Sequence, residues 1–348
     1  MNPYISTILF SGLALGTTIT LTSSHWLMAW MGLEINTLAI IPLMSQHHHP
    51  RATEAATKYF LTQATAAAIM LFSATLNAWL TGLWHIQELT HPMTTTMMLT
   101  ALALKLGLAP IHSWMPDVMQ GLDLLTGLVM STWQKLAPFI LLIQIQPNAP
   151  QTITALGLLS TLIGGWGGLN QTQLRKILAY SSIAHLGWMA LIMQFSSTLA
   201  LLTLLTYFIM SIATFMLFKT NKTTTINTLA LSSTKLPMMT AIAPLLLLSL
   251  GGLPPLTGFM PKWMIIQELT KQDLAPLATI AAISALLSLF FYLRLSYNMT
   301  LTMFPNIITA TTPWRLPLSK PSLPLAISAT ASLLLLPLTP TIIAMLTP

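Results

Sequence analysis

Cysteine is absent from the 348 residues of this chain. This absence excludes disulfide bonds, thiolate-based zinc sites, covalent haem attachment and iron–sulfur ligation by the chain. Charge is also scarce, because Asp, Glu, Lys and Arg make up only 6% of the residues, whereas soluble domains carry about 25%. So few charged side chains do not cover the surface of a water-soluble protein of this size. The composition therefore predicts a protein whose solvent is lipid.

Long polar segments are missing too, and apolar segments fill the chain, which is 54% hydrophobic. A helix needs about 20 apolar residues to cross the hydrocarbon core of a bilayer. On this measure the sequence predicts an all-α polytopic membrane protein with about eleven transmembrane helices. They cover residues 3–22, 25–45, 52–80, 93–121, 124–146, 150–170, 175–194, 198–219, 237–270, 275–303 and 323–346. The loops between them leave no room for a soluble catalytic domain.

The basic residues are distributed unevenly between the two sides of the predicted bundle. Ten lie on the side of the N-terminus: Arg51, Lys58, Arg175, Lys176, Lys219, Lys222, Lys235, Arg294, Arg315 and Lys320. On the opposite side the sequence places only Lys271. Loops rich in Lys and Arg stay on the cytoplasmic side, which in a mitochondrion is the matrix. The asymmetry also accounts for the net charge of +7 without a nucleic-acid partner, since the chain has no clustered basic patch.

Two segments rich in helix breakers interrupt the apolar pattern. GLAPIHSWMPDVM at 107–119 and GLPPLTGFMPKWM at 252–264 are identical at six of thirteen positions. Five crossings separate the helices that hold them, so these helices run in opposite directions. The pattern predicts a single membrane domain, 1–348, with two inverted five-helix repeats (3–146 and 150–303), each containing a broken helix, and a final helix at 323–346.

The breakers have a physical consequence in lipid. Proline removes an amide donor, so carbonyl groups near each break lose their helical partners. Lipid tolerates such groups only where they face protein or a water-filled cavity. We therefore expect a hydrated pocket at mid-membrane, the alternative being two proline kinks that only shape the bundle.

Four ionisable residues fall inside predicted spans: Glu34, Lys105, Lys135 and Lys262. Each costs about 2.5–3.5 kcal/mol at a helix centre. Ion pairing accounts for Glu34 with one lysine, but the chain has only seven acidic residues and no obvious carboxylate for the other two lysines. Removal from water disfavours the charged form of a lysine, so a buried lysine can gain and lose a proton. Three lysines suit protons better than metal cations, which prefer oxygen ligands.

Other polar and small residues support weaker predictions. His112 either extends a proton path or bonds to carbonyl groups freed by Pro110. His185 and Ser181 either line such a path or make ordinary hydrogen bonds between helices. Gly164 and Gly168, four residues apart, predict a face for close helix packing.

With these residues identified, five segments carry a resemblance that covers the whole chain. They are WMGLEINTLAIIPLM (30–44), ALALKLGLAPIHSWMPDV (101–118), STWQKLAP (131–138), LRKILAYSSIAHLGWM (174–189) and GGLPPLTGFMPKW (251–263). The chain resembles the NADH–ubiquinone oxidoreductase chain 2 family, the antiporter-like membrane subunits of respiratory complex I. In that family Glu34 and Lys105 match a charged pair, Lys135 the central lysine, and Lys262 the lysine of the second broken helix.

The resemblance implies a function, a location and partners. The chain is expected to translocate protons as a subunit of NADH:ubiquinone reductase in the mitochondrial inner membrane, with its N-terminus in the matrix and its C-terminus in the intermembrane space. It is expected to hold no metal or redox cofactor, while FMN, iron–sulfur clusters and ubiquinone belong to other subunits. Its partners are expected to be lipids and other membrane subunits, including neighbouring antiporter-like ones. The alternatives are a stand-alone cation/proton antiporter and a structural subunit with an inactive proton path.

Overall fold

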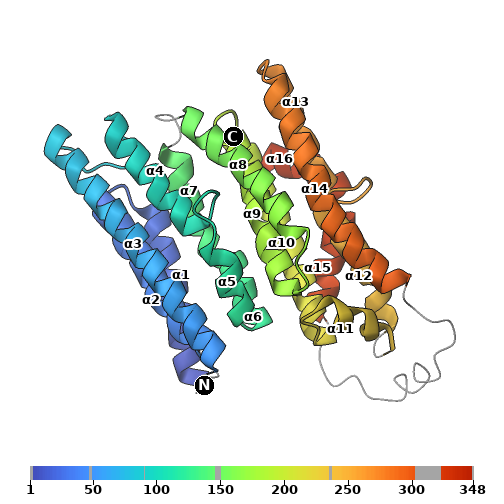
Figure 1. Cartoon of the computed structure of the whole chain (residues 1–348). Coiled ribbons are helices and arrows are strands. Elements are labelled where there is room, and N and C mark those ends of the chain that lie inside the picture. The colour runs from blue at the N-terminus through green and yellow to red at the C-terminus, as the bar shows by residue number, and fades with distance from the viewer. Residues whose placement is uncertain are drawn as a thin grey trace. The chain divides into compact units, whose positions relative to one another are not determined.

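The computed structural model describes residues 3–46, 49–89, 91–145, 150–234, 237–301 and 323–346. The chain divides into two compact units, Met1–Ser160 and Thr161–Pro348. The first unit holds α1 (Pro3–Thr22), α2 (Trp26–Met44), α3 (Pro50–Thr81), α4 (Pro92–Leu106), α5 (Trp114–Gly121), α6 (Leu124–Ser131) and α7 (Trp133–Ile145), and ends within α8 (Pro150–Gly168) (Figure 1). The second holds α9 (Leu174–Ile192), α10 (Ser197–Asn221), α11 (Ile226–Ala230), η2 (Leu231–Thr234), α12 (Pro237–Gly251), α13 (Phe259–Lys271), α14 (Ala275–Thr300), α15 (Leu323–Leu334), η5 (Leu336–Leu338) and α16 (Thr339–Leu346).

Every regular element in the described ranges is a helix, so the all-α prediction is confirmed for that part of the chain. Six helical segments there are long and apolar enough to cross a membrane, one of them being α6 and α7 taken together (Leu124–Ile145), and a bent pair at 323–345 brings the number to seven. The two helices predicted to be broken do not pass this test, because each consists of two shorter pieces.

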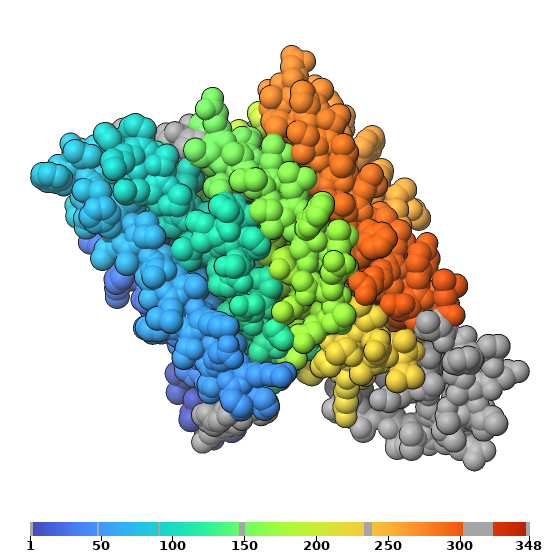
Figure 2. Space-filling view, viewed as in Figure 1, coloured from blue at the N-terminus to red at the C-terminus, as the bar shows by residue number. Residues whose placement is uncertain are grey.

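Small residues allow a close crossing of α1 and α2 in the first unit. A Cβ atom on Gly16 of α1 would lie 2.8 Å from the carbonyl oxygen of Gly32 of α2, and the reverse distance is also 2.8 Å. Neither position therefore has room for a larger side chain, as is common where membrane helices pack backbone to backbone. Next to this pair, α3 packs along both α4 and α5, and the close-packed surface of this region is seen in Figure 2.

In the second unit, α10 packs against α9, α12, α13 and α15. Two glycines of α8 lie at close contacts there. A Cβ atom on Gly164 would lie 2.6 Å from the backbone nitrogen of Ala184, and one on Gly168 would lie 2.8 Å from the ring of Phe291. The prediction that these glycines permit close helix packing is confirmed.

Two helices predicted to be continuous are not. The predicted helix 124–146 is interrupted at Thr132, which has φ −115° and ψ −74° and separates α6 from α7. The Thr132 hydroxyl donates to the Leu128 carbonyl at 2.8 Å, a bond that bends helices. The predicted helix 323–346 bends by 67° between α15 and the segment that follows. Pro337 lies at this bend and cannot donate the helical hydrogen bond.

Candidate functional site

The two breaker segments end their helices in the same way. Gly107 (φ 77°) directly follows the last residue of α4, and Gly252 (φ 81°) directly follows the last residue of α12. The Gly107 amide donates to the carbonyls of Ala103 and Leu104 at 2.9 and 3.2 Å, and the Gly252 amide donates to Leu248 and Ser249 at 3.0 and 3.1 Å. The left-handed conformation explains glycine at both sites, because it satisfies the last carbonyls without a Cβ clash.

Beyond each glycine the backbone is not helical, as the breakers predict. The first gap runs from Gly107 to the start of α5 and the second from Gly252 to the start of α13. Both gaps contain a cis peptide bond before proline, at Pro110 and at Pro255.

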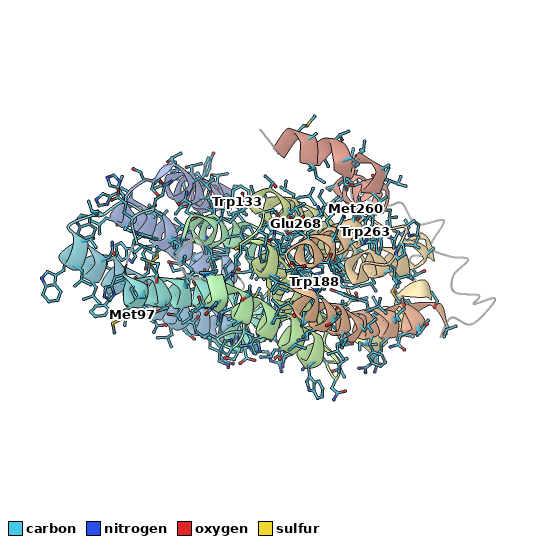
Figure 3. All side chains as sticks on the ribbon, turned by 90° about the horizontal axis from the view of Figure 1, so that it is seen from above. Met97, Trp133, Trp188, Met260, Trp263 and Glu268 are labelled. Carbon is cyan, nitrogen blue, oxygen red and sulfur yellow. The ribbon has the colours of Figure 1, made fainter. Side chains whose placement is uncertain are left out.

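Side chains beyond each break donate back to the carbonyl groups of the preceding half-helix. In the first unit, Trp114 Nε1 donates to the Leu104 carbonyl at 3.1 Å. In the second, Lys262 Nζ donates to the Gly251 carbonyl at 2.8 Å. Phe259, which corresponds to Trp114, has no polar atom, so the lysine supplies the donor instead. Lys262 belongs to α13, and three other residues of this helix, Met260, Trp263 and Glu268, are labelled in Figure 3.

A small cavity lies beside the first break, entirely within the first unit. Its walls come from α2 to α7: Leu33, Thr37, Tyr59, Gln63, Lys105, Leu106, Trp114, Met115, Met130, Gln134, Lys135 and Pro138. The cavity offers about 20 Å³ to the centres of water molecules, and one water needs about 10–15 Å³ on this measure. Two of the predicted site residues, Lys105 and Lys135, therefore face one space with room for about one water.

Lys105 occupies the last turn of α4, where the helix dipole favours a positive charge. It is only 7% exposed, and its Nζ makes no hydrogen bond within the described part of the chain. Glu34 on α2 lies within range to attract it electrostatically. Glu34 Oε2 is also buried without a hydrogen-bond partner among the described residues, and Glu34 does not line the cavity.

Lys135 lies in the first turn of α7, directly after the interruption at Thr132. It is 2% exposed, and its backbone amide donates to the Thr132 carbonyl at 3.2 Å. Pro138, three residues later, lines the same cavity. The interruption and the proline give this stretch an irregular backbone where the lysine enters the cavity.

The second unit holds the fourth predicted residue, Lys262. It is half-buried and bound to the end of α12 as described above. The second break is further fixed by Thr257, whose hydroxyl donates to the Ser332 carbonyl of α15. The structure thus brings together three of the four predicted residues in the first unit and places Lys262 at the break of the second.

Polar residues of α2, α3 and α7 were missed by the sequence reasoning. Thr37, Tyr59, Gln63 and Gln134 line the cavity with the two lysines, and Gln134 Nε2 donates to the Asn36 carbonyl at 3.3 Å. Tyr59 and Gln63 are four residues apart and so share one face of α3. That spacing was the available signal, but nothing in the sequence indicated which helix this face would meet.

The structure gives the surroundings of the two histidines. His112 Nδ1 lies 3.2 Å from the Pro110 carbonyl oxygen, which is not a carbonyl that Pro110 leaves without a helical donor, so both roles expected for His112 stay predictions. The His185 ring packs against Tyr207 of α10 with 5.2 Å between ring centroids. Within the described ranges, no three His, Asp or Glu side chains lie close enough to hold a metal ion.

Buried lysines on a water-sized cavity beside an interrupted apolar helix are features of the antiporter-like class of membrane proteins. Comparisons with known proteins agree. A family model described as NADH:quinone oxidoreductase/Mrp antiporter matches residues 23–288, and one described as NADH dehydrogenase subunit 2 C-terminus matches residues 289–343.

Individual relatives narrow the class. The NADH-ubiquinone oxidoreductase chain 2 proteins of Tetraodon nigroviridis and Gadus morhua are 69% and 67% identical to this chain, each over 99% of both sequences. A chain in the structure of respiratory complex I from Thermus thermophilus superposes with a TM-score of 0.87 at 27% identity, over 99% of this chain and 81% of that one. This protein belongs to the NADH-ubiquinone oxidoreductase chain 2 family.

Proposed function

We propose that this chain, an antiporter-like membrane subunit of proton-translocating NADH:ubiquinone oxidoreductase, relays protons through Glu34, Lys105, Lys135 and Lys262. The single observation that carries the proposal is the cavity shared by Lys105 and Lys135. Two buried lysines on one water-sized space form a pair through which a proton can pass without entering lipid.

The topology that we propose has eleven crossings, in two inverted five-helix repeats at 3–146 and 150–303 followed by a final helix at 323–346. The matching glycine caps at Gly107 and Gly252 support the repeat. The basic asymmetry supports an N-terminus in the matrix and a C-terminus in the intermembrane space. Three of the basic residues that enter this argument, Lys235, Arg315 and Lys320, lie outside the described residues.

The mechanism follows from repulsion between neighbouring protonated lysines. A proton arriving on Lys105 would repel one on Lys135, and for charges about 5–10 Å apart with an effective dielectric constant near 20 this repulsion is roughly 1.7–3.3 kcal/mol. A membrane potential opposes proton export by about 2.3 kcal/mol per 100 mV. The repulsion exists only after free energy has been spent to bring the first proton to Lys105, so it biases a relay but does not drive it uphill. The driving force must therefore come from other subunits of the complex.

The composition of the chain agrees with a driving force that comes from other subunits. Without cysteine it supplies no thiolate ligand for an iron–sulfur cluster, so we place the clusters in other subunits. We place FMN and the ubiquinone site there too, because the family resemblance implies it. The partners of this chain are then the other membrane subunits, neighbouring antiporter-like subunits included, and the lipids around them.

The test is substitution of Lys135 in the assembled complex. Lys135→Met keeps roughly the length of the side chain and its apolar stem but removes the ammonium group. We therefore expect the complex to assemble and to pump fewer protons per NADH oxidised. Lys135→Arg should also impair pumping, because guanidinium keeps its proton. Lys271→Met is the control, since Lys271 is exposed and forms a surface ion pair with Glu268 at 3.3 Å. Normal pumping by an assembled Lys135→Met complex would remove Lys135 from the path and favour an inactive, structural subunit.

A further inference from the structure

Helix α3 contributes a buried amide to the cavity that the relay described above does not use. Gln63 is 3% exposed and lines the cavity with Lys105 and Lys135. Its Nε2 atom makes no hydrogen bond within the described part of the chain, and neither does Lys105 Nζ. Leaving a buried polar group without a partner is costly, so two such groups on side chains that line one cavity indicate a polar partner that the protein itself does not supply.

The size and walls of the cavity identify what fits. About 20 Å³ is available to water centres, which suits about one water but no larger ligand. A buried water also needs two to four polar partners. Lys105, Lys135, Gln63 and Gln134 supply them, while Leu33, Leu106, Met115 and Met130 close the cavity with apolar surface.

We infer that Gln63 is a positioning residue that holds one water molecule between Lys105 and Lys135. The glutamine amide has both donor and acceptor atoms, so it can orient this water in either direction of transfer. In one transfer, the ammonium group of Lys105 gives a proton to the water oxygen while the water gives one of its own protons to the neutral amine of Lys135. The water is regenerated and no oxidant or reductant is consumed. This inference rests on the proposed relay.

The experiment uses Gln63→Met in the assembled complex, with Gln151→Met as the matched control. Methionine has nearly the shape of glutamine but lacks the amide, and Gln151 carries the same amide at an exposed position. We expect Gln63→Met to assemble and to slow proton-coupled turnover about tenfold, the size expected when one hydrogen bond in a transfer path is lost. The solvent deuterium isotope effect on coupled turnover should rise, because proton transfer becomes the slow step. A purely structural defect would lower the amount of enzyme without changing that isotope effect.

A map of the wild-type complex that resolves buried waters supplies the second measurement. It should show a water within hydrogen-bond distance of Lys105 Nζ and the Gln63 amide, and that density should disappear in Gln63→Met. An empty cavity in such a map, or an unchanged rate and isotope effect in Gln63→Met, overturns the role of Gln63. If Lys135→Met impairs pumping and Gln63→Met does not, only this inference fails. If Lys135→Met pumps normally, the relay itself fails.

Discussion

Replacing Gly252 with alanine tests how the second break holds Lys262. The backbone there has φ +81°, a conformation that costs a residue with a Cβ atom roughly 1–2 kcal/mol. The new Cβ atom would also lie 2.9 Å from Lys262 Cδ and 3.1 Å from Lys262 Nζ. Contacts this short push the flexible end of Lys262 away from the Gly251 carbonyl, to which it donates at 2.8 Å. The same Cβ atom would also lie 3.1 Å from the carbonyl oxygen of Gly258, which is backbone.

Weakening of the Lys262 hydrogen bond adds to the loss of stability caused by Gly252→Ala. A net hydrogen bond contributes about 0.5–1.5 kcal/mol, and one from a charged group about 1.5–3 kcal/mol. Gly252→Ala should therefore destabilise the protein by about 1.5–5 kcal/mol in total. Gly82→Ala supplies the matched control, because Gly82 also has a positive φ of 75° but nothing lies within 4 Å of its added Cβ atom.

The assay is the midpoint of thermal inactivation of the assembled complex, measured with protons pumped per NADH. Gly252→Ala should lower both the inactivation midpoint and the number of protons pumped per NADH by more than Gly82→Ala does. In a Lys262→Met background the excess should become smaller, because the contact with the lysine is lost while the contact with the Gly258 carbonyl oxygen stays. Equal effects of the two glycine substitutions, or an excess of unchanged size without Lys262, would refute the reasoning.

Three further outcomes are expected. Trp114→Phe removes the Nε1 bond to the Leu104 carbonyl and should cost about 0.5–1.5 kcal/mol, measured as a lower inactivation midpoint, whereas Trp166→Phe at a 73% exposed position should have little effect. Gly164→Val should impair assembly, because a Cβ atom alone would already lie 2.6 Å from the Ala184 nitrogen; normal levels of assembled complex would contradict this. An impermeant label should reach the segment 219–236 only from the matrix side, since basic loops stay there, and labelling from the intermembrane side alone would reverse the proposed topology.

Sequence reasoning succeeded where the cause is local. Scarce charge and apolar segments of membrane-spanning length determine a helical membrane protein, because backbone groups in lipid must bond within their own segment. Gly107 and Gly252 followed by proline determine the two breaks, because no neighbouring helix can restore a missing amide donor or relieve a positive φ. Glu34 and Lys105 could also be recognised from the sequence, because a charged residue inside an apolar helix is costly and therefore needs a reason.

Tertiary packing decided what those residues face. The interruption at Thr132 does not follow from its hydroxyl bond to the Leu128 carbonyl alone, because Thr62 makes the same kind of bond to the Lys58 carbonyl inside the uninterrupted helix α3. The shared cavity depends on which face of α3 meets α4 and α7, and a helix with alanine and threonine around its circumference does not reveal that face. Tyr59 and Gln63 therefore became part of the site only when α3 packed against the first break. The sequence by itself determined that buried lysines and broken helices exist. Packing decided that Lys105 and Lys135 share one water-sized space, because contacts between helices depend on surfaces that are far apart in the chain.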